Sequence, residues 1–168
     1  FNADTQWWNF LTTLYQPRGG NVGQQEPVAI YNFTGNADDT SGNENHGTAV
    51  GAILTEDRFG NPDSAYYFNG FDAKDDYIET VSSGPYGTSA RTVTFWAKTT
   101  ETQRQPVIGW GEPLNGQQFL IELDDDWGGG VTVNAYSQSI TYQIDGLDDQ
   151  WHHYAVILPE KANPALTD

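Results

Sequence analysis

The chain has 168 residues, and 23 acidic residues against 7 lysines and arginines give it a formal net charge of −16 at pH 7. Proteins that bind nucleic acid or anionic membrane surfaces need clustered cations, so this charge excludes both classes. Cysteine and methionine are absent, which excludes disulfides, thiolate metal sites and thiol nucleophiles. No apolar run approaches the roughly 20 residues of a membrane span. Because 14% of the residues are aromatic, we expect a folded domain and not a disordered acidic tail.

Residues 1–27 are predicted to be an aromatic N-terminal segment followed by a linker. Thr5–Tyr15 is the only helix-like stretch of the chain, and a helix this short is stable only when it docks on another surface. Gln16–Pro27 contains Gly, Gln and Pro without periodicity, as a linker does. Residues 28–168 are then the single predicted domain.

The rest of the chain alternates apolar and polar residues with period 2 and is rich in β-branched and aromatic residues. This pattern predicts strands at Val28–Phe33, Ala65–Phe68, Tyr77–Val81, Thr92–Lys98, Pro106–Trp110, Phe119–Leu123, Val131–Tyr136, Ser139–Ile144 and His152–Leu158. Clusters of Gly, Asn, Asp and Pro separate these runs. Strands spaced in this way indicate an antiparallel β-sandwich.

Four sequence blocks carry a family resemblance. They are Ala29–Thr48, with its Asp39-Thr40-Ser41-Gly42-Asn43-Glu44-Asn45-His46-Gly47-Thr48 loop; Arg58–Ile78; Thr92–Lys98; and Trp151–Val156. In this order they resemble the laminin-G-like domains of the concanavalin A-like lectin/glucanase superfamily. The resemblance implies an all-β, antiparallel, two-sheet jelly-roll sandwich.

The chain departs from this family at its C-terminal end. In the family, the strand that begins Trp-His-His is followed by a hairpin and further strands, and this sequence ends at Asp168 before any of them. The resemblance therefore implies a jelly roll that lacks its last strands. Either those strands belong to a longer chain or another chain supplies them, because the open edge of a sheet invites pairing.

The loop Asp38–Gly47 concentrates carboxylate, amide and main-chain oxygens, the donors that Ca²⁺ prefers. The resemblance implies a structural calcium ion at this loop. Carried over residue by residue, its ligands are Asp39, Asn43, Asn69, Gly70 and Asp72. The alternative is that Asp39, Ser41 and Asn43 bond their own backbone in Asx and Ser turns.

A second acidic group lies at the end of the predicted strand Phe119–Leu123. Alternation places Glu122, Asp124 and Asp126 on one face, and their spacing resembles the catalytic strand of laminarinase-like glycosidases. A pair of such carboxylates could act as nucleophile and acid/base in retaining hydrolysis. Because Gly128, Gly129 and Gly130 follow directly, we expect a solvated turn here, without catalysis.

Aromatic side chains and histidines complete the candidate residues. Trp110 and Trp127 stand beside Gly-rich turns and are the predicted ligand-binding rings. Trp96 lies within apolar alternation and is predicted to be in the core. His152 and His153 are neighbours and point to opposite faces, so they cannot bind one metal ion. The resemblance implies that His153 packs beneath the sheet together with Trp151, which we also place in the core.

These observations predict a non-catalytic recognition or adhesion module, stabilised by Ca²⁺, that binds a glycan or a cell-surface protein. The acidic, cysteine-free, Trp- and Tyr-rich composition is typical of secreted or cell-surface prokaryotic modules. Two alternatives stay open. The chain could be a subunit of an extracellular assembly that strands from another chain complete, with the aromatic N-terminal segment docking on a neighbour. It could also be a glycoside hydrolase built on Glu122 and Asp124.

Overall fold

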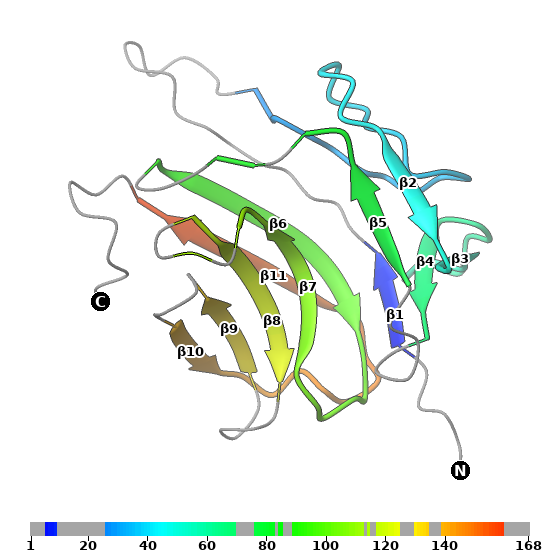
Figure 1. The fold of residues 1–168 in the computed structure, drawn as a ribbon. Helices are drawn as coiled ribbons and strands as arrows, with labels where there is room; N and C mark the ends of the chain where they lie inside the picture. Colours follow the sequence, from blue (N-terminus) through cyan, green and yellow to red (C-terminus); the bar gives the residue numbers. More distant parts are fainter. Residues whose placement is uncertain are drawn as a thin grey trace.

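The computed structural model describes residues 6–9, 26–69, 76–82, 84–85, 89–112, 114, 117–124, 130–134 and 139–159. These residues form an all-β fold of antiparallel sheets without a helix, which is consistent with a β-sandwich (Figure 1). None of the described segments forms a helix with the length and apolarity of a membrane span.

The larger sheet has five described strands in the order β11-β6-β1-β4-β3. These strands are β1 (Gln6–Asn9), β3 (Ile53–Thr55), β4 (Ala65–Phe68), β6 (Arg91–Lys98) and β11 (His152–Leu158). The longest pairing joins β11 to β6, from His152 opposite Ala97 to Leu158 opposite Arg91, without a register shift. This sheet thus brings together strands from the whole length of the chain.

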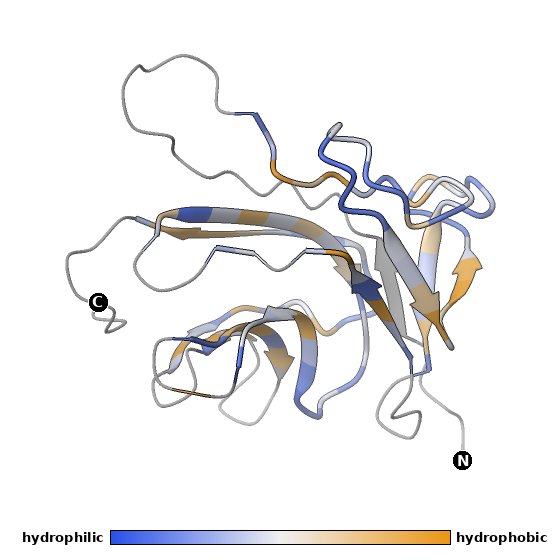
Figure 2. Cartoon of the chain, turned by 45° about the horizontal axis from the view of Figure 1, so that its top comes forward, coloured by the Kyte–Doolittle hydropathy of each residue, from blue (hydrophilic) through white to orange (hydrophobic). Residues whose placement is uncertain are grey.

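The second sheet has four described strands in the order β10-β9-β8-β7, so consecutive strands are neighbours. They are β7 (Gln105–Trp110), β8 (Phe119–Asp124), β9 (Gly130–Asn134) and β10 (Ser139–Gln143). A separate pair joins β2 (Gly47–Val50) to β5 (Tyr77–Thr80). Figure 1 shows the β7–β10 sheet as a layer against β6 and β11, and Figure 2 shows apolar and polar residues alternating along the strands.

The core lies between these two layers. Val93 and Phe95 of β6 and Ile121 and Leu123 of β8 are fully buried, and the ring of Phe95 stacks on Tyr154 of β11 with centroids 4.9 Å apart. Every second residue of β6 is buried, as the predicted alternation requires. The strands predicted at Ala65–Phe68 and His152–Leu158 are confirmed with the same bounds, and most others within a few residues.

The predicted helix over Thr5–Tyr15 is wrong at Gln6–Asn9, which form strand β1. Its other residues and the predicted linker up to residue 25 lie outside the described part of the chain. Strand β1 pairs with β4 on one side and with β6 on the other. A short isolated helix is marginal in water, whereas an inserted strand satisfies backbone groups on both of its sides.

The predicted strand Val28–Phe33 is also wrong, although its alternation is right. Ala29, Tyr31 and Phe33 are buried, yet the only β-pairing described within the segment is an isolated bridge between Tyr31 and Asp39. Phe33 has a φ of 53°, a left-handed conformation that interrupts an extended strand. The short strands β2 and β3 were not predicted.

Trp96 and His153 lie on the outer face of the larger sheet, so their predicted places in the core are wrong. Trp96 is half-buried and His153 is exposed, with ring centroids 5.1 Å apart. The Arg58 guanidinium covers Trp96 at 4.5 Å from the ring centroid. Trp151 is half-buried just before β11. The core side of β11 is the side of Tyr154, because Tyr154 is the residue that packs on Phe95.

Candidate functional site

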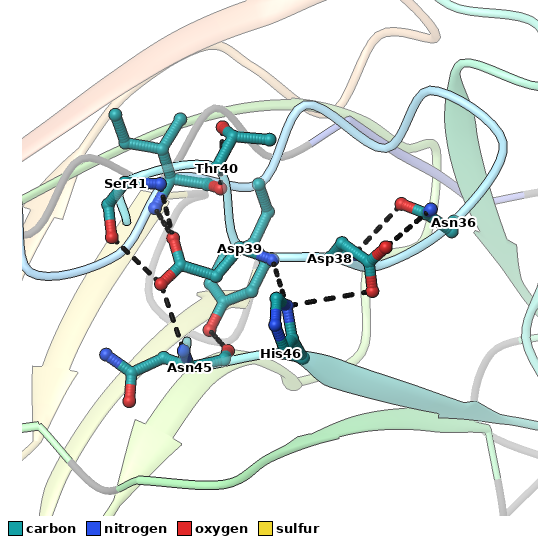
Figure 3. A network of polar contacts seen from close by, with 9 residues as sticks. Asn36, Asp38, Asp39, Thr40, Ser41, Asn45 and His46 are labelled. Atoms are coloured by element: carbon teal, nitrogen blue, oxygen red, sulfur yellow. Dashed lines mark hydrogen bonds and ion pairs between the residues drawn. The ribbon is translucent and has the colours of Figure 1, made fainter. Parts of the chain in front are cut away.

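The carboxylate of Asp39 organises the loop between residues 27 and 46 (Figure 3). Its Oδ1 accepts hydrogen bonds from the backbone N–H groups of Ile30 and Ser41, both at 2.8 Å. Its Oδ2 accepts hydrogen bonds from the Ser41 hydroxyl at 2.8 Å and from the backbone N–H of Asn45 at 3.0 Å. One buried side chain therefore ties together three parts of the loop.

These bonds determine the charge state of Asp39. Burial raises the pKa of this carboxyl, but the hydrogen bonds from Ile30, Ser41 and Asn45 outweigh burial and hold the pKa below its ordinary value. The carboxylate thus stabilises the fold above the ordinary pKa of aspartate, and this contribution is lost as the pH falls through the lowered pKa. Burial, with the charge of Asp39 as a smaller cause, raises the pKa of Tyr31 to about 12.

The neighbouring residues extend the same network. The backbone N–H of Asp39 donates to Nδ1 of His46 at 3.2 Å, and this nitrogen lies 3.7 Å from Oδ1 of Asp38. Asn36 and Asp38 bond one another through an amide-to-carboxylate and a backbone-to-amide hydrogen bond. Figure 3 shows these contacts as one continuous set of polar groups.

Of the five predicted calcium ligands, the structure describes Asp39, Asn43 and Asn69. A carboxylate offers about four lone-pair positions, and protein donors fill four at Asp39. The Asn43 amide donates to the carbonyls of Pro27 and Val28. Asn69 is exposed and its amide oxygen accepts from the Tyr67 hydroxyl. Gly70 and Asp72 lie outside the described residues.

Two further observations bear on the loop. No group of three or more His, Cys, Asp or Glu side chains that could hold a metal ion occurs within the residues that the structure describes. The contacts of Asp39, Ser41 and Asn43 are those of the alternative interpretation, in which Asx and Ser turns bond their own loop.

Glu122 is the second buried carboxylate and has a different environment. It lies in β8 and is 2% exposed, and its partner within the described residues is the guanidinium of Arg104, which forms an ion pair with Oε2. Arg104 directly precedes β7 in the sequence, and its side chain is half-exposed. The structure does not describe the side chain of Asp124. Asp126 and Trp127 lie entirely outside the described residues.

Glu122 belongs to a row of polar residues across the β7–β10 sheet. Its neighbours Ile121 and Leu123 face the core, so alternation directs Glu122 to the outer face. Thr132 of β9 lies directly opposite Glu122, and Thr141 of β10 lies opposite Thr132. The two threonine hydroxyls are 2.9 Å apart and share a hydrogen bond.

The same face holds a polar atom without a partner. Asn134 follows Thr132 by two positions on β9 and lies opposite Leu120. Its amide oxygen is buried and accepts no hydrogen bond within the described part of the chain. Such groups are rare in native proteins because leaving one unsatisfied costs about 1–3 kcal/mol. This oxygen is therefore an unexplained polar atom on the outer face of the sheet.

Four residues near Glu122 were not among the predicted site residues: Arg104, Thr132, Asn134 and Thr141. Alternation along β9 could have placed Thr132 and Asn134 on one face. It could not have placed them beside Glu122, because that neighbourhood depends on strand register.

Trp110, predicted to bind a ligand, packs within the protein. Its ring lies 4.4 Å from that of Phe119 between centroids, and its indole N–H donates to the carbonyl of Pro85 at 2.9 Å. A Cβ added at Gly84 would come within 2.5 Å of the Trp110 ring, so a glycine is needed there. These contacts account for the position of Trp110 without a ligand.

Comparisons with known proteins give no family for this chain. No family model, no curated protein and no solved structure matches it.

Proposed function

We propose that the chain is a non-catalytic recognition module, a jelly-roll β-sandwich that binds carbohydrate on the outer face of the β7–β10 sheet. The observation that carries this proposal is the polar set on that face, where the half-exposed Arg104 pairs with Glu122 and the amide oxygen of Asn134 has no partner within the described residues. A secreted or cell-surface location fits a ligand of this kind and the acidic, cysteine-free composition.

The chemistry of the face suits sugar hydroxyls. A hydroxyl group donates one hydrogen bond and accepts others, so it pairs with a site that offers both kinds of partner. Arg104 is half-exposed and supplies N–H donors, and the buried Glu122 beside it holds the guanidinium in place. The threonine pair Thr132 and Thr141 can do either. Polar groups that strands hold in fixed positions favour a ligand that pairs with all of them, because a ligand that leaves one unpaired loses binding free energy.

The environment of Glu122 argues against hydrolysis. Retaining glycosidases need two carboxyl groups about 5–5.5 Å apart, one of which delivers a proton to the leaving group. The Oε2 atom of Glu122 accepts a hydrogen bond from the Arg104 guanidinium. This pairing fits a role of Glu122 in positioning Arg104.

Affinity electrophoresis through gels that contain neutral polysaccharides tests the proposal. We expect wild type to be retarded by at least one polysaccharide, and Asn134→Ala and Thr141→Val to lose most of that retardation. Thr92→Val, on the half-buried outer side of β6, is the matched control and should migrate like wild type. Wild type that no polysaccharide retards, or Asn134→Ala that still binds fully, would contradict the proposal.

An assay for reducing sugars on the same polysaccharides tests the absence of catalysis. We expect none to be released by wild type. Reducing sugar that wild type releases and Glu122→Gln does not would show that the protein is a hydrolase and not a recognition module.

A further inference from the structure

Strand β11 forms one edge of the larger sheet among the described strands, and this edge is a second candidate interaction surface besides the outer face of the β7–β10 sheet. β11 is the outermost strand of the larger sheet, and no described strand pairs with its other side. Its seven residues pair with β6 from end to end without a bulge. In an antiparallel strand, alternate residues direct their N–H and C=O groups to opposite sides, so the open side presents a regular row of donors and acceptors.

The other edge strands of the two sheets are shorter than β11, and β7 is also protected. β3 has three residues. β7 contains Pro106 and a register shift between Pro106 and Ile108, two devices that block the addition of a strand. β10 has five residues. β11 by contrast contains no proline, lysine, arginine, aspartate or glutamate in the sequence His-His-Tyr-Ala-Val-Ile-Leu, and therefore lacks the usual protection of an edge.

The side chains of β11 leave apolar surface on both faces of this edge. Val156 and Leu158 pack against the core and are only half-buried. On the outer face, Ala155 is exposed and Ile157 is 70% exposed. A strand added here would cover Val156 and Leu158 only if its own inward-facing residues were apolar.

We propose that β11 pairs with β11 of a second copy of this chain, antiparallel and about a twofold axis at Ala155. This register places Tyr154 opposite the partner's Val156, and Ile157 opposite the partner's His153. Inward-facing residues then meet inward-facing residues, and the two larger sheets join into one. The apolar alternation that an incoming strand needs is present in β11 itself, and a strand without acidic residues adds no like-charge pair at the contact.

The net charge of −16 on each copy gives the association a distinctive salt dependence. Repulsion between two acidic proteins weakens as added salt screens it. Dimerisation should therefore tighten when NaCl is raised from about 0.05 M to about 0.5 M. Pairing with a basic segment of another protein would weaken over the same range. This inference is independent of carbohydrate binding, which we place on the other sheet.

Sedimentation equilibrium over a range of protein and salt concentrations tests the proposal. We expect a reversible dimer. Ala155→Lys and Ala155→Glu should each weaken it by about tenfold, because each sets two like charges opposite one another. Mixing the two variants should restore a heterodimer at least as tight as the wild-type dimer, which native mass spectrometry resolves by mass. Ala155 is exposed, so both variants should keep the wild-type circular dichroism.

Ser139→Lys, exposed on the β10 edge, is the matched control and should dimerise like wild type. Three outcomes would overturn the proposal: a monomer up to about 1 mM protein at every salt concentration, a dimer that neither Ala155 variant weakens, or a mixture of the two variants that stays monomeric. Dimerisation that Ser139→Lys abolishes would instead place the interface at β10.

Discussion

Asp39 and Glu122 are both buried carboxylates, 6% and 2% exposed, but their surroundings differ. Asp39 is bonded entirely by groups within 9 residues of it in the sequence. Glu122 pairs with Arg104, 18 residues away and half-exposed, and lies on the sheet face that leaves Asn134 with an unfilled acceptor. A carboxylate saturated by its own loop stabilises that loop, whereas a buried carboxylate paired with a half-exposed arginine can hold the arginine in place for recognition.

The largest effect should come from removing the saturated carboxylate. Asp39→Ala leaves the backbone N–H groups of Ile30, Ser41 and Asn45 without their acceptor, and we expect a loss of about 3 kcal/mol in the free energy of unfolding. The melting temperature should fall by roughly 10 °C. Urea unfolding measures the first quantity and calorimetry the second.

The neighbouring Asp38 is the matched control for this change. Its side chain is half-exposed, so Asp38→Ala should cost less than about 1 kcal/mol. Equal losses for the two variants would mean that Asp39 does not organise the loop.

A smaller loss of stability is expected when the Glu122 pair is broken. Arg104→Leu leaves the buried Glu122 carboxylate uncompensated and should cost roughly 2 kcal/mol, less than for a fully buried pair because Arg104 is half-exposed. The double variant Arg104→Leu/Glu122→Leu should recover to within about 1 kcal/mol of wild type, since no unpaired charge remains. Urea unfolding of the four proteins, with Glu122→Leu as the fourth, gives the coupling between the two side chains.

The double variant also separates stability from binding. It should lose retardation by polysaccharide even though its fold is recovered. A double variant that still binds would remove the Arg104–Glu122 pair from the proposed carbohydrate site.

The smallest effect should be that of calcium. Because protein donors fill the acceptor positions of Asp39, a cation would have to displace one of them. We expect added Ca²⁺ or a chelator to change the melting temperature by less than about 1 °C. A rise with Ca²⁺ that Asp72→Ala removes would establish a calcium site and contradict this expectation.

Sequence reasoning was most successful where a pattern is local. The strand His152–Leu158 was predicted with its observed bounds because its apolar residues alternate and turn residues precede it. The turn-forming contacts of Asp39 and Ser41 were foreseen as one of two interpretations because they join residues two positions apart. Such features need no knowledge of which strands become neighbours.

The failures share a different cause. Trp96 alternates like a core residue, but only the packing of β6 against β8 decides which of its two faces is inside. Gln6–Asn9 favoured a helix in isolation, and a position between β4 and β6 makes them a strand. Tertiary contacts override local preference in both cases, because the free energy of burial and of ladder hydrogen bonds exceeds the difference in propensity.

The sequence by itself determined that this chain is acidic, free of thiol chemistry and built from β-strands, because composition and period-2 alternation are properties of the chain alone. Only the tertiary structure decided that Asp39 is saturated, that Glu122, Thr132 and Thr141 form one row, and that β11 lies at the edge of the larger sheet among the described strands. Those properties depend on register and on sheet order. Both are determined by the packing of residues far apart in the sequence.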